Sequence, residues 1–142
     1  MISSIIFNIC FVCLWTLVAI YPPSHKILRK RKTYNIFLFI SILLPIITFL
    51  SYDKNEEVYS KNIFYGSFFF LIFLLLYKYF DNYILKKNQR NLILSIRFNN
   101  FWQDEESEKQ TSLELFFQIS LLGIPIFYIL LANSLVMNFQ IK

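Results

Sequence analysis

The chain has 142 residues, of which 56% are hydrophobic and 20% aromatic, and its formal net charge is +5 at neutral pH. The apolar residues lie in long continuous blocks, a composition typical of membrane proteins, and too little polar chain remains for a separate soluble domain. A window of about 20 residues, the length that crosses a bilayer core of about 30 Å as a helix, finds four such blocks. We predict an all-α integral membrane protein: residues 1–142 form one domain, a small bundle of four transmembrane helices with both termini outside.

The first predicted span covers residues 3–21. No Lys or Arg precedes this block, and a cationic run follows it, where stop-transfer charges belong, so we expect a retained helix rather than a cleaved signal peptide. Cys10 and Cys13 share one face of this helix. Because the sequence has no second cysteine pair, we interpret them as packed side chains rather than as metal ligands or a redox pair.

The loop at residues 22–33 carries five closely spaced cations. They are Lys26, Arg29, Lys30, Arg31 and Lys32. We interpret this run as a determinant of membrane topology whose cations rest against anionic headgroups. A specific contact with an anionic lipid or with an acidic protein partner is the alternative. Nucleic acid is not expected as a partner, because so short a loop between two spans cannot present an element that reads a groove.

The second and third predicted spans cover residues 34–52 and 63–80. Pro45 lies inside the second span and is expected to kink it. The third span is rich in Phe on every face, so part of its surface must point outward. That outward surface suits packing against a neighbouring membrane protein, with Phe69 and Phe73 as the residues to test.

The third loop, residues 85–112, has a basic half followed by an acidic half. Its apolar run LILSIRFNNFW fits a helical period and a strand period equally well. We favour a short interfacial amphipathic helix with Trp102 as its anchor, while an irregular loop and a docking surface for a partner stay open as alternatives. The residues expected to contact a partner are Arg97, Trp102, Asp104, Glu105 and Glu106.

The fourth predicted span covers residues 113–135, with a second internal proline at Pro125. Either Asp104 caps the start of this helix, or Thr111 and Glu114 form a capping box. The acidic residues before the span lack the alternating spacing and the turn glycine of a calcium loop, so we expect no metal.

Neutral polar residues inside the spans are expected to form hydrogen bonds between helices. The residues expected to form them are Asn8, Gln118 and Asn133, and the spans also contain Thr16, Ser41, Thr48, Ser67 and Ser120. Asp81 is expected to form an ion pair with Lys78 at the end of the third span. No span carries a charged residue in its central turns, which argues against a transporter.

The cations also predict the orientation of the chain. The first and third loops carry five Lys or Arg residues each, whereas the second loop carries only Lys54 and Lys61. The first and third loops are therefore expected in the cytoplasm, with the protein in a bacterial cytoplasmic (inner) membrane or, alternatively, in an organellar inner membrane.

The sequence contains no constellation that indicates catalysis, a cofactor or a metal. We predict a non-enzymatic accessory or scaffold subunit of a larger membrane protein complex. Its expected partners are membrane lipids and other integral membrane proteins or copies of itself. The alternative hypothesis is a self-assembling membrane effector, or an immunity protein, of a bacterial defence or competition system.

Overall fold

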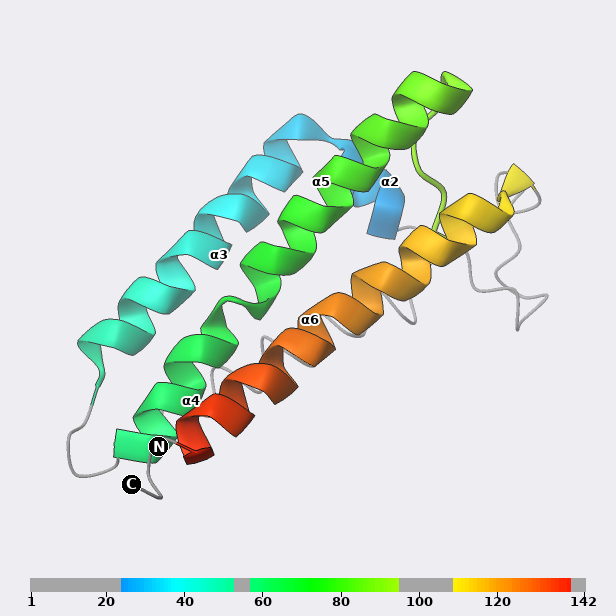
Figure 1. The fold of residues 1–142 in the computed structure, drawn as a ribbon. Coiled ribbons are helices and arrows are strands. Elements are labelled where there is room, and N and C mark those ends of the chain that lie inside the picture. The colour runs from blue at the N-terminus through cyan, green and yellow to red at the C-terminus, as the bar shows by residue number, and fades with distance from the viewer. Residues whose placement is uncertain (1–23, 53–56, 95–108, 139–142) are drawn as a thin grey trace, which may run out of the picture.

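The computed structural model describes residues 24–52, 57–94 and 109–138, and the regular structure within these ranges is helical. The elements are α2 (Ser24–Arg29), α3 (Arg31–Leu50), α4 (Glu57–Ser67), α5 (Phe69–Asn88) and α6 (Ser112–Asn138). The long helices lie side by side (Figure 1). Three segments, Arg31–Leu50, Ile63–Asn88 and Ser112–Ala132, are long and apolar enough to cross a membrane. The second, third and fourth predicted spans are therefore confirmed as candidate membrane helices, whereas the first precedes the described residues.

The region predicted as a loop at 22–33 is largely helical. Helix α2 ends at Arg29, the backbone is extended at Lys30, and α3 begins at Arg31. Lys, Ile, Leu and Arg are all good helix formers, and no Gly or Pro interrupts residues 24–32. Two of the predicted loop cations, Arg31 and Lys32, thus belong to the first turn of α3.

The third span is also longer than predicted, and it is interrupted. Helix α4 ends at Ser67, and α5 begins after Phe68 and continues to Asn88. The hydroxyl of Ser67 donates a 2.6 Å hydrogen bond to the carbonyl of Phe64 within its own helix, and Gly66 precedes it. Gly and a Ser that bonds to the backbone both weaken a helix, which accounts for the break at this point.

Helix α5 is the central helix of the bundle. In the apolar window of the segment Ile63–Asn88, to which α5 contributes most residues, 44% of the residues are buried, compared with 17% for Arg31–Leu50 and 28% for Ser112–Ala132. The core residues contributed by α5 recur every three or four positions, so they form one stripe. They are Phe69, Phe73, Leu74, Tyr77, Phe80 and Ile84. Phe69 and Phe73 therefore face the core, and the prediction that they lie on an outward surface was wrong.

Aromatic rings join the helices along their length. Phe80 of α5 stacks on Phe117 of α6 with 4.2 Å between ring centroids and an interplanar angle of 4°. Phe37 of α3 and Phe70 of α5 pack in an edge-to-face arrangement, with 5.9 Å between ring centroids. Such pairs contribute about 0.5–1.5 kcal/mol beyond the burial of their area, which matters in a membrane because lipid is as apolar as the core.

The polar residues within the spans form bonds of two kinds. The hydroxyl of Thr48 of α3 has two acceptors, the carbonyl of Pro45 in its own helix at 3.0 Å and the hydroxyl oxygen of Ser67 of α4 at 3.3 Å, and the second is the expected kind of bond between helices. Ser41 and Ser120 instead donate to carbonyls of their own helices, those of Leu38 and Phe116.

Both internal prolines, Pro45 and Pro125, lie within helices that continue past them. Pro45 and Pro125 are buried. The kink predicted from these prolines stays a prediction.

The chain reverses direction after α5. Gln89 adopts a left-handed conformation with φ 56°, and its amide donates to the carbonyl of Leu85, which closes the last turn. Residues 91–94 then run without regular structure, and Leu92, Ile93 and Leu94 are buried. The predicted interfacial helix is therefore wrong for these residues, which pack into the protein instead of facing headgroups. The rest of that predicted helix lies between the described ranges.

Candidate functional site

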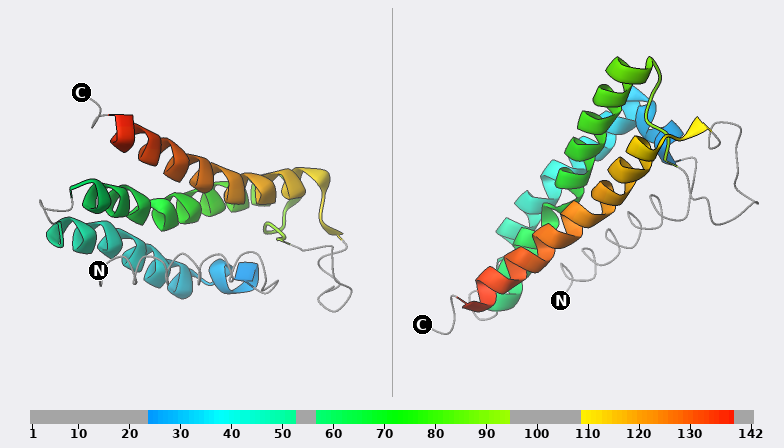
Figure 2. Two further views of the ribbon diagram at one scale, coloured as in Figure 1. Left: turned by 90° about the horizontal axis from the view of Figure 1, so that it is seen from below. Right: turned by 45° about the vertical axis from the view of Figure 1, so that its right-hand side comes forward.

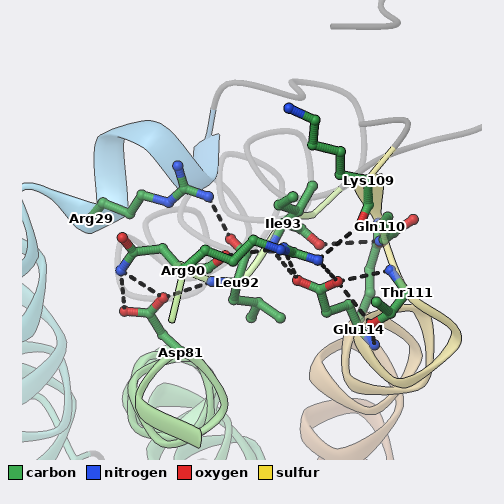
Figure 3. A network of polar contacts seen from close by, with 11 residues as sticks. Arg29, Asp81, Arg90, Leu92, Ile93, Lys109, Gln110, Thr111 and Glu114 are labelled. Atoms are coloured by element: carbon green, nitrogen blue, oxygen red, sulfur yellow. Dashed lines mark hydrogen bonds and ion pairs between the residues drawn. The ribbon is translucent and has the colours of Figure 1, made fainter. Parts of the chain in front are cut away.

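We call residues 91–94 the clamped segment. It lies at the end of the bundle where α5 ends and α3 and α6 begin, which we call the cationic end (Figures 1 and 2). An extended segment has no helical partners for its amides and carbonyls, and when it is buried these groups must be bonded by other parts of the chain. Side chains from the surrounding helices and from the residues that flank the segment supply these bonds (Figure 3).

Asp81 of α5 holds the first part of the clamped segment. One of its carboxylate oxygens accepts a 3.0 Å bond from the amide of Leu92 and a 3.2 Å bond from the side-chain amide of Asn91. Only 2% of Asp81 is exposed. Lys78, one turn earlier, forms the expected ion pair, but its ammonium is 3.8 Å away. The main contacts of Asp81 are thus with the clamped segment.

Glu114 of α6 holds the next residue. Its carboxylate accepts the amide of Ile93 at 3.2 Å and forms a two-pronged pair with the guanidinium of Arg90, with distances of 2.7 and 2.8 Å. Glu114 is fully buried, whereas 30% of the Arg90 side chain is exposed. Charged bonds of this fork geometry are among the strongest in proteins, and they make the burial of Glu114 tolerable.

Glu114 also helps to cap the start of α6. Its carboxylate accepts the amide and the hydroxyl of Thr111 at 2.8 and 2.9 Å, and its own amide donates to the Thr111 hydroxyl at 3.4 Å. This reciprocal arrangement is a capping box, and it confirms the prediction made from the spacing of Thr111 and Glu114. One carboxylate therefore caps a helix and holds the clamped segment.

Two further side chains bind the carbonyls of the clamped segment. Arg29 of α2 donates to the carbonyl of Leu92 at 2.9 Å, and Gln110 donates to that of Ile93 at 3.1 Å. Gln110 also donates to Gln118 of α6 at 2.9 Å. Gln118, expected to bond between helices, is buried and accepts this bond from Gln110, which precedes its own helix.

The residues that flank the range 95–108 are held close together by this network. Arg90 donates a 2.8 Å bond to the carbonyl of Lys109, and Gln110 reaches back to Ile93. The chain on either side of residues 95–108 is therefore bonded together, residues 90–93 to residues 109 and 110.

The predicted site residues divide into three groups. Arg29 and Gln118 belong to the network, and Lys30, Arg31 and Lys32 are exposed at the cationic end with Lys26 half-buried beside them. Asn133 lies in α6. Outside the described ranges are Asn8, Arg97, Trp102, Asp104, Glu105 and Glu106.

Sequence reasoning missed the roles of Asp81 and Arg90. Asp81 was assigned to a helix-end ion pair, and Arg90 was counted only as a cation that sets orientation. The spans were expected to carry no charge in their central turns, and the two buried acids, Asp81 and Glu114, lie near the ends of their helices. No local spacing indicated the contacts of Asp81 and Arg90, because they depend on the reversal of the chain at Gln89.

The carboxylate oxygens of Asp81 and Glu114 all accept bonds from this chain, so the network fixes backbone rather than presenting an acid to a ligand. Within the described ranges, no group of three His, Cys, Asp or Glu residues could hold a metal ion. No family model matches the sequence, and no curated protein or solved structure is significantly similar to it.

Proposed function

We propose that the protein is a non-enzymatic accessory or scaffold subunit of a larger membrane protein complex, and that it offers residues 95–108 to a partner. The observation that carries this proposal is the pair of bonds that join the chain before and after this range. Arg90 donates to the carbonyl of Lys109 and to Glu114 of α6, and Gln110 donates to the carbonyl of Ile93. A segment held at both ends loses less conformational freedom on binding, which favours a docking role.

The composition of the 95–108 range supports the same proposal. It contains Trp102, an aromatic residue of the kind that anchors interfaces, and the acids Asp104, Glu105 and Glu106. An acidic partner-facing segment beside exposed cations of the same chain would favour a partner with a basic surface. The bundle itself, with three candidate membrane helices, would supply the membrane anchor.

The test is native mass analysis of the tagged protein, extracted in mild detergent from its own host. We expect different proteins to co-migrate with the 17.1 kDa chain. A species that contains only multiples of the chain would contradict the proposal and favour the self-assembling effector.

A pair of variants then tests the docking segment. Asp104→Asn, Glu105→Gln and Glu106→Gln together should release the partner. Asp53→Asn, Glu56→Gln and Glu57→Gln remove the same charge from the loop between the second and third spans and serve as the matched control. Equal capture by both triple variants would mean that residues 95–108 do not dock the partner.

A further inference from the structure

One tyrosine ring at the cationic end has an exposed cation of a neighbouring helix beside it and an exposed cation on the same face of its own helix. The ammonium of Lys78 of α5 lies 5.8 Å from the ring centroid of Tyr34 of α3. Arg31 is three positions before Tyr34 and therefore occupies the same face of α3. The Tyr34 hydroxyl donates a 3.2 Å bond to the carbonyl of Leu74, which holds the ring against α5.

The ammonium of Lys78 has hydrogen-bond donors that its contact with Asp81 does not use. Its contact with Asp81 is long, at 3.8 Å, and Asp81 already accepts closer bonds from Leu92 and Asn91. An ammonium carries three donors, and 49% of the Lys78 side chain is exposed. Arg31 is exposed as well. Both cations can thus accept an external anion while the polar network stays intact.

The contact with Tyr34 places the ammonium of Lys78 near the level of lipid headgroups. Helix α3 has 20 residues, and at 1.5 Å per residue it spans roughly the 30 Å of a bilayer core, so its first turn lies at the edge of the hydrocarbon. Tyr34 belongs to that turn, and the Lys78 ammonium lies 5.8 Å from its ring centroid. Tyr79 and Tyr83 of α5 are exposed, and tyrosine concentrates at the membrane interface.

The charge of this surface selects an anionic headgroup. The exposed charged residues that the structure describes at the cationic end are all basic, since the two acids there, Asp81 and Glu114, are buried. These exposed cations are Lys30, Arg31, Lys32, Lys78, Lys86, Lys87 and Lys109. A zwitterionic headgroup would bring its own cation into this field, whereas an anionic one would not.

We propose that Arg31, Lys78 and Tyr34 form a binding site for one anionic phospholipid, with the two cations on its phosphate and the Tyr34 ring beside its headgroup. The acyl chains lie along the exposed apolar surface of α3, which includes Ile42 and Phe49. The site is distinct from the proposed docking segment, so each can fail without the other.

The experiment is native mass spectrometry of the full chain in a neutral detergent, titrated with phosphatidylglycerol. We expect one tightly bound lipid in the wild type. Arg31→Gln and Lys78→Gln should each lower its affinity about fivefold, because a cation near the surface contributes about that factor to the binding of anionic lipid. Phosphatidylcholine should bind more weakly, and soluble glycerol phosphate should not displace the lipid.

Lys86→Gln is the matched control, since Lys86 is equally basic and exposed on α5 but lies two turns beyond Lys78. It should bind phosphatidylglycerol like the wild type. If Lys78→Gln disturbs folding through Asp81, then Arg31→Gln, which touches no part of the network, decides the question, and Lys78→Arg should restore binding. Equal affinities for Arg31→Gln and Lys86→Gln, or equal binding of the two lipids, would overturn the proposal.

Discussion

At the scale of single residues, Glu114 has the most partners in the network. Glu114→Ala would remove the partner of the Arg90 guanidinium, the acceptor for the Ile93 amide and the cap on Thr111. Breaking a buried pair costs about 3–5 kcal/mol, and because 30% of the Arg90 side chain is exposed to screening we expect a loss of about 2–3 kcal/mol in the free energy of unfolding. Denaturation in mixed detergent micelles measures this loss.

Two other variants serve as comparisons for the stability loss of Glu114→Ala. Glu114→Gln keeps an acceptor for the Thr111 amide and should lose less than Glu114→Ala. Leu115→Ala changes an exposed neighbour in the same turn and should lose under about 1 kcal/mol, because it leaves no buried cavity. A loss for Glu114→Ala as small as that for Leu115→Ala would show that the network does not stabilise the fold.

Residue roles were predictable from sequence where the signal was local. Thr111 and Glu114 are three positions apart, and this spacing alone identifies the capping box. The bond from Asp81 to Leu92 and the pair of Arg90 with Glu114 depend on a chain reversal at Gln89, a residue that rarely adopts positive φ. Because the left-handed residue is Gln89 rather than the neighbouring Asn88 or Asn91, a sequence pattern could not indicate where the chain reverses or which groups the reversal brings together.

At the scale of helices, the contact between α3 and α4 includes the bond from Thr48 to Ser67. Bonds of this kind in membranes contribute about 0.6 kcal/mol on average. We expect that value as the coupling energy in a double-mutant cycle of Thr48→Val and Ser67→Ala, measured by unfolding in mixed micelles.

Ser41→Ala is the control for this cycle. Ser41 is buried in the same helix and, like Thr48, donates to a carbonyl of its own helix, but Thr48 is the one of the two that also bonds to Ser67, so Ser41→Ala should show no coupling with Ser67→Ala. A coupling no larger for Thr48 than for Ser41 would mean that this bond does not join the helices.

Three of the helices were predicted from long apolar blocks, but which face of each helix is buried was not. A helix that is apolar all round carries no periodic signal for its buried side. The burial of Phe69 and Phe73 was therefore unpredictable from hydropathy, and it arises because α5 is central and packs against both α3 and α6. The helix at residues 24–29 was missed because charged helix formers resemble loop residues in a hydropathy window. The break at Phe68 was missed because Gly66 and Ser67 do not interrupt an apolar block in such a window.

At the scale of the whole molecule, the fold gathers cations at one end. The starts of α3 and α6 and the end of α5 meet there, although they lie far apart in sequence (Figure 1). Among the described residues, Lys61 is the one Lys or Arg near the other end. This asymmetry in three dimensions strengthens the orientation argued from the loops, in which the cationic end faces the cytoplasm.

Cysteine accessibility tests that orientation. In a background with Cys10 and Cys13 replaced by Ser, Ser51→Cys and Lys87→Cys place one thiol at each end of the bundle, on residues that are exposed. A membrane-impermeant maleimide applied to intact cells should label Ser51→Cys at once and Lys87→Cys only after permeabilisation, since translocating the clustered cations is disfavoured. Labelling of Lys87→Cys in intact cells would instead place the cationic end outside, and with it the polar network and both ends of the 95–108 range. No cytoplasmic partner could then reach the proposed docking segment, so this measurement constrains the function as well as the topology.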